Sequence, residues 1–82
     1  MFKLERELTK IGFNRLQEKE DCVYFEKMIE QSKDETHQIC IVYDKKKKKI
    51  KSMDTFMIND VEMKMVQNDR SLKNVLTHLL SS

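Results

Sequence analysis

The chain has no proline, no tryptophan, no alanine and one glycine, Gly12. A single glycine cannot build a glycine-rich phosphate loop, so the common nucleotide-binding motifs are excluded. The four scarce residue types have GC-rich codons, whereas lysine, which supplies all but three of the 16 basic residues, has AT-rich codons. We therefore expect a gene of AT-rich bacterial, phage or mobile-element type.

Long apolar runs and a secretory signal are also missing. No apolar stretch approaches the roughly 18 residues that a membrane span needs, and residues 1–7 alternate charge without an apolar centre. We expect a cytoplasmic protein with no membrane partner, in which Cys22 and Cys40 are reduced thiols. The 82 residues suffice for a single small domain, residues 1–82, with one modest core.

Few side chains have the chemistry of an active site. His37 and His78 are the two histidines, and neither lies near a serine or cysteine at the spacing of a nucleophile and its base. His37 and Cys40 would point to opposite faces of a strand, which disfavours a metal site. Cys22 and Cys40 are expected about 10 Å apart on paired strands, too far for a disulfide. The sequence thus predicts a protein that is not an enzyme and has no cofactor or metal.

The residues that are present predict an α+β fold. Leu4, Leu8 and Ile11 line one face of a helix that ends at Gly12, the position of a left-handed cap. A three- to four-stranded antiparallel meander is expected to follow, because apolar residues alternate with polar ones or are β-branched and aromatic in segments 13–18, 22–29, 37–43 and the residues from Ile50.

A C-terminal amphipathic helix is predicted from Leu72 to Leu80, capped by Asp69 or Ser71. Segment 53–66 fits either a helix or a strand. Asn59, with Glu62 three residues later, resembles a capping box and favours a helix from about Asp60. The two terminal helices are expected on one face of the sheet, so the other face is solvated or meets a partner.

This order of helix, strands and helix is similar to that of double-stranded-RNA-binding domains. Those domains place a lysine-rich motif at the start of the second helix. The corresponding residues here, 68–73, read Asn-Asp-Arg-Ser-Leu-Lys and do not match that motif. The resemblance is therefore one of element order, and it transfers no binding residue to this chain.

Five consecutive lysines follow an apolar run and are the sharpest local feature. A block of like charge cannot be buried, so it predicts an exposed turn with a high positive potential. The turn is either a solvated hairpin connection or a loop that contacts the phosphates of a nucleic acid. The candidate contact residues are Lys45, Lys46, Lys47, Lys48 and Lys49.

Four of the six methionines fall within thirteen residues, at Met53, Met57, Met63 and Met65. Methionine side chains fill irregular cores, and they also adapt to partners at interaction surfaces. We therefore consider a non-enzymatic interaction or regulatory protein that binds a protein partner or itself through this segment. The alternative is a nucleic-acid-binding protein that uses the lysine run.

Overall fold

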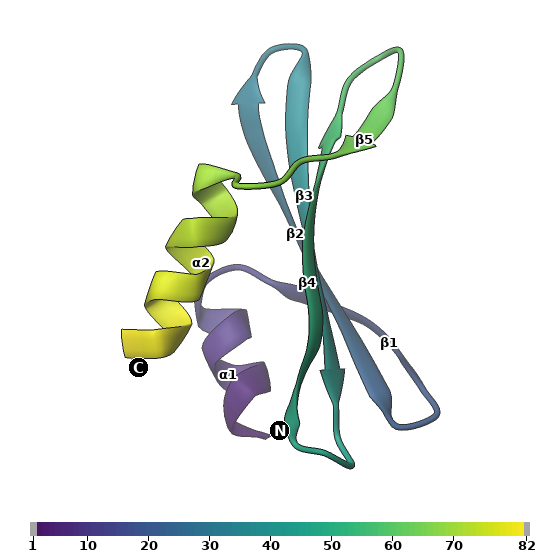
Figure 1. Cartoon of the computed structure of the whole chain (residues 1–82), viewed down its shortest axis with the longest axis vertical. Coiled ribbons are helices and arrows are strands. Elements are labelled where there is room, and N and C mark those ends of the chain that lie inside the picture. The colour runs from purple at the N-terminus through teal and green to yellow at the C-terminus, as the bar shows by residue number, and fades with distance from the viewer. Residues whose placement is uncertain (1, 82) are drawn as a thin grey trace. The chain divides into compact units, whose positions relative to one another are not determined.

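The computed structural model of the chain describes residues 2–81 (Figure 1). An N-terminal helix, an antiparallel sheet and a C-terminal helix follow one another, which confirms the predicted α+β class and element order. The sheet has five strands in the order β1-β2-β3-β4-β5, one more than the predicted maximum of four. The elements are α1 (Lys3–Lys10), β1 (Asn14–Lys19), β2 (Cys22–Ser32), β3 (Glu35–Asp44), β4 (Lys49–Ile58), β5 (Met63–Met65) and α2 (Arg70–Ser81).

Helix α1 ends just before Gly12, which takes the left-handed cap position that the sequence predicts. Gly12 has a φ of +94°. Its amide donates to the carbonyl of Thr9 (3.1 Å), and the amide of Phe13 donates to the carbonyl of Leu8 (2.9 Å). These two bonds are those of a Schellman motif. Leu8 and Phe13, the two positions whose apolar contact commonly accompanies this motif, are both buried.

The described residues divide into two compact units that share the three long strands. The first unit comprises residues up to 27 and 40–53, and the second comprises 28–39 and 54 onward. Strands β2, β3 and β4 begin in one unit and end in the other. Each unit has its own helix and one outer strand of the sheet.

In the first unit, Val23 and Phe25 are buried on one side of β2, and Phe2, the N-cap of α1, contacts Phe25 on that side. Arg15 of β1 pairs in register with Phe25 and therefore shares that side. Its guanidinium lies 3.5 Å from the carboxylate of Glu5 on α1. The register between β1 and β2 shifts at Leu16, and this bulge leaves the Leu16 side chain exposed.

In the second unit, α2 begins at Asp69, one of the two predicted caps. The Asp69 carboxylate accepts a hydrogen bond from the amide of Ser71 (2.6 Å) and contacts Nδ1 of His37. Nε2 of His37 lies 3.1 Å from Glu35 of the same strand. Because His37 is nearly buried and held between two carboxylates, it joins α2 to β3.

The helix expected from Asp60 is wrong. Strand β4 continues to Ile58, and β5 pairs back on it in antiparallel register. Asn59 does accept hydrogen bonds from the amides of Val61 and Glu62, both 2.8 Å, as an N-cap would. The chain turns instead of coiling, because the apolar residues of β5 recur at every second position and pair with those of β4.

Candidate functional site

The lysine run forms the exposed turn that the sequence predicts. Lys45 to Lys48 connect β3 to β4, and Lys49 is the first residue of β4. The carboxylate of Asp44 accepts hydrogen bonds from the amides of Lys46 (2.9 Å) and Lys47 (3.0 Å). Those bonds fix the backbone of the turn, because they replace the strand ladder where it ends. All five lysine side chains are exposed.

The five charges are not equivalent. Nζ of Lys45 donates to Glu18 of β1 (2.5 Å), and its amide donates to the carbonyl of Asp21 (2.8 Å). The hydrogen bond from Lys45, followed by its charge, lowers the pKa of the Glu18 carboxyl. Within residues 2–81, no ion pair closer than 4.0 Å engages the side chains of residues 46–49. Four ammonium groups are therefore available to an anion.

Asp44 is the acidic residue inside this positive surface. Its pKa is lowered chiefly by the hydrogen bond from the Lys47 amide, with further contributions from the Lys46 amide and the charges of Lys47 and Lys51. Oδ1 of Asp44 accepts both hydrogen bonds from the backbone amides of the turn. This carboxylate therefore organises the turn and also cancels part of the positive charge of the lysines.

An aromatic pair lies beside the turn in the same unit. The rings of Phe2 and Tyr43 are stacked, with centroids 4.9 Å apart and planes inclined by 16°. The rings of Phe2 and Phe25 form a T-shaped pair with centroids 6.2 Å apart, which connects the stacked pair to the core. A shallow hollow is lined by Phe2, Tyr43, Lys45 and Lys48. It brings two rings and two ammonium groups together.

The methionines do not form one surface. Met53 lies in the first unit and is half-buried. The other three belong to the second unit, where the β4–β5 register separates them. Met57 pairs with Lys64, whereas Met63 and Met65 pair with Ile58 and Phe56. Paired residues share a side of the sheet, so Met63 and Met65 lie on the opposite side from Met57.

Strand β5 is an edge strand with an ordered set of unpaired backbone groups. The amide of Val66 donates to the carbonyl of Thr55 (2.8 Å), and that of Asn59 donates to Glu62 (3.0 Å). Hydrogen-bonded pairs alternate with non-bonded pairs in an antiparallel ladder. The backbone groups of Lys64 therefore point toward β4, and those of Met63 and Met65 point outward. Within the described residues, no strand lies beyond β5.

The side chains of this edge are apolar and exposed. Met63 is 61% exposed and Met65 is 54% exposed. Their register partners Ile58 and Phe56 are half-buried, and Val61 of the preceding turn is 93% exposed. We call this surface, formed by Phe56, Ile58, Val61, Met63 and Met65, the β5 edge patch.

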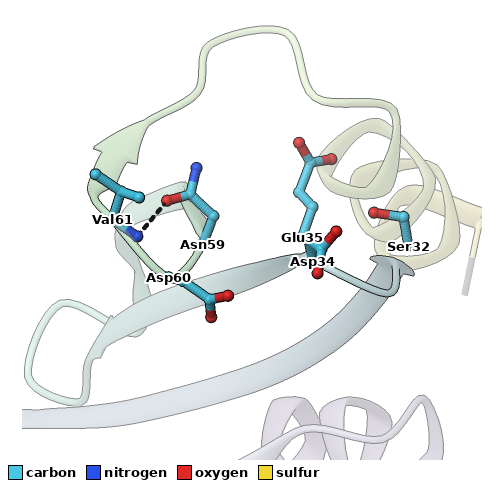
Figure 2. A pocket seen from close by; sticks show the side chains of 6 residues that line it. All are labelled: Ser32, Asp34, Glu35, Asn59, Asp60 and Val61. Carbon is cyan, nitrogen blue, oxygen red and sulfur yellow. Dashed lines mark hydrogen bonds between the residues drawn. The ribbon is translucent and has the colours of Figure 1, made fainter.

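A second hollow, in the second unit, is lined by acidic and polar side chains where the first hollow has lysines (Figure 2). It lies between the β2–β3 turn and the β4–β5 turn and is lined by Ser32, Asp34, Glu35, Asn59, Asp60 and Val61. The side chains in Figure 2 come from both turns, and three of them are carboxylates. No group of three histidine, cysteine or acidic side chains in the described chain could hold a metal ion. The negative charge of the hollow repels phosphate.

Sequence reasoning missed the Phe2–Tyr43 pair and the outward edge of β5. The pair joins residues about forty positions apart, so no local periodicity signals it. The alternation of Val61, Met63 and Met65 did signal a strand. The capping-box pattern at Asn59 outweighed that signal.

Cys22 and Cys40 are both thiols.

Comparison with protein-family models, with curated proteins and with solved structures gave no match to this chain. No family therefore supports the likeness in element order to double-stranded-RNA-binding domains. No helix among residues 2–81 is long and apolar enough to cross a membrane.

Proposed function

We propose that this protein is a non-enzymatic interaction module that acts in the cytoplasm by binding a protein partner along β5. The observation that carries the proposal is the outward orientation of the Met63 and Met65 backbone groups beside exposed methionine side chains. An extended segment that adds to such an edge gains main-chain hydrogen bonds, and its alternate side chains supply specificity.

The β5 edge patch defines the chemistry of that segment. Residues of the segment that lie opposite Met63 and Met65 share their side of the sheet. On that side, Phe56 and Ile58 of β4 follow on the far side of β5. Apolar side chains at these two positions would cover exposed apolar area. The residue between them faces Lys64 on the other side, so an acidic side chain there is favoured. The partner segment therefore reads apolar, acidic, apolar.

Lys64 also argues against pairing between two copies of β5. A symmetric antiparallel pair centred on β5 places Lys64 directly opposite Lys64 of the second copy. Like charges at directly opposed positions destabilise a sheet, and lysine on an edge strand commonly prevents such association. The edge therefore favours a different chain over a second copy of this one.

A peptide titration followed by amide chemical shifts tests the proposal. The probe is a soluble synthetic peptide of about nine residues with Ile-Glu-Ile at its centre, and the matched peptide has Ile-Lys-Ile. We expect the amides of Met63 and Met65 to shift with the acidic peptide, and binding of the basic peptide to be at least about fivefold weaker. Size measurement by light scattering should show a monomer.

Two variants separate backbone pairing from side-chain contact. Met63→Pro removes the outward N–H without breaking a bond to β4, because proline is tolerated at such positions of edge strands. Met63→Ala keeps the N–H. Binding that is lost in Met63→Pro and retained in Met63→Ala supports strand addition. Equal binding by both variants, or no shift at β5 with about 2 mM peptide, overturns it.

A further inference from the structure

We propose that the lysine turn and the Phe2–Tyr43 pair together form a binding site for single-stranded nucleic acid. This site uses residues of the first unit alone and does not depend on β5 or on the proposed protein partner. The proposal rests on the turn fixed by Asp44, whose four ammonium groups at residues 46–49 have no ion-pair partner within 4.0 Å in the described chain. This turn borders the hollow lined by the stacked rings of Phe2 and Tyr43.

The turn supplies the electrostatic half of the site. Its backbone is held by Asp44, which lowers the entropic cost of presenting the lysines of residues 46–49 from one short segment. Each contact between an ammonium group and a phosphate releases a counterion. Lys45 contributes less, because Glu18 already neutralises it.

The aromatic pair supplies the other half. Bases stack on protein rings in single-strand binding proteins, next to a positive groove that follows the backbone. Phe2 and Tyr43 are both half-buried, and both line the hollow. Contacts within the pair and with Phe25 hold the rings in place before a ligand arrives. Lys45 and Lys48 line the same hollow, within reach of the phosphate that follows a stacked base.

The rings distinguish a single strand from other anions. In a duplex the base faces are covered by neighbouring bases, so the hollow could contact only the backbone. An isolated phosphate would use the lysines and leave the rings without a partner. Arginine, the usual reader of base edges, does not line the hollow, and Arg15 is engaged with Glu5 and Glu18. The site should therefore tolerate many sequences.

Fluorescence anisotropy with labelled oligonucleotides of about 12 nucleotides tests this site. The probes are oligo(dT), oligo(rU) and a DNA duplex of the same length, each titrated at several salt concentrations from about 20 to 150 mM. We expect either or both single strands to bind at least about fivefold tighter than the duplex. Four phosphate contacts predict a slope of log K against log salt near about −3.

Variants separate the two halves. Lys46→Gln/Lys47→Gln should flatten the salt slope by about 1.4, because each lost contact removes about 0.7. The matched double variant Lys33→Gln/Lys73→Gln loses the same charge in the second unit and should leave the slope unchanged. Tyr43→Leu should weaken single-strand binding by at least about fivefold at an unchanged slope, since it removes stacking and keeps the charge.

Three outcomes overturn the proposal. The first is no single-strand binding at the lowest salt, and the second is equal affinity for duplex and single strand. The third is an equal loss of slope in both lysine double variants, which would indicate diffuse attraction to a basic protein. Phe2→Leu serves as a second ring variant if Tyr43→Leu fails to fold, and the amide spectrum of each variant reports its fold. None of these results changes the expectation for the β5 peptide.

Discussion

Gly12 holds a backbone conformation, φ +94°, that residues with a Cβ rarely adopt. A Cβ at this position would meet the Cε of Lys27 at 3.3 Å, the flexible end of a side chain that can move away. The cost of a substitution is therefore one of backbone strain more than of contact. We expect Gly12→Ala to lower the free energy of unfolding by about 1 kcal/mol, measured by urea denaturation.

A matched substitution isolates the backbone effect. Asparagine tolerates the left-handed conformation better than alanine, although its side chain is larger. Gly12→Asn should therefore be more stable than Gly12→Ala. The reverse order would mean that crowding against Lys27, whose Nζ donates to the carbonyl of Ile11 (2.5 Å), dominates the cost.

Single residues also show which structural features can be predicted from the sequence and which cannot. Gly12 could be placed at a helix end because its one structural property, freedom at positive φ, is local. The stacking of Phe2 on Tyr43 depends on which strand passes the N-terminus, and no pattern within a short window contains that information. The lysine turn could be located from its charge alone, but the pairing of Lys45 with Glu18 could not.

At the scale of elements, the register of the β4–β5 hairpin determines on which side of the sheet each methionine lies. Met57 lies on the same side of β4 as Thr55, which is 1% exposed, whereas Met65 lies on the other side and is 54% exposed. We expect Met57→Glu to cost about 1–2 kcal/mol of unfolding free energy and Met65→Glu about 0.5 kcal/mol or less. Chemical denaturation of the two variants measures the difference.

The same pair of variants links stability to binding. Met65→Glu should remain folded and lose affinity for the Ile-Glu-Ile peptide, because it places a charge in the β5 edge patch. If Met65→Glu unfolds the protein as readily as Met57→Glu does, Met65 belongs to the core and the patch is not an interface.

The hairpin also explains the one element that sequence reasoning predicted wrongly. Asn59 satisfies two following amides, which is the opening step of both a helix and a tight turn. The outcome depends on whether the next residues bury more apolar area as a helix or as a strand. Here Met63 and Met65 pair with Ile58 and Phe56 across the hairpin, a gain that involves residues outside the four positions of a capping pattern.

At the scale of the whole molecule, the two units raise the question of whether they unfold separately. Each has about 40 residues, a size at which a chain without disulfides or metal rarely folds alone. Each also consists of two separate stretches of chain, and the boundary cuts β2, β3 and β4. Separate unfolding would require each of these three continuous strands to stay folded in one unit and unfold in the other.

We therefore expect one cooperative transition. In urea, the amide signals of Leu8 and Ile41, in the first unit, should lose intensity with the same midpoint as those of Ile39 and Val75 in the second. Since both sets are buried, a shared midpoint reports the cores and not the frayed ends. Two separated midpoints would show that the two units unfold independently. In that case the lysine turn and β5 would belong to parts of the molecule that open independently.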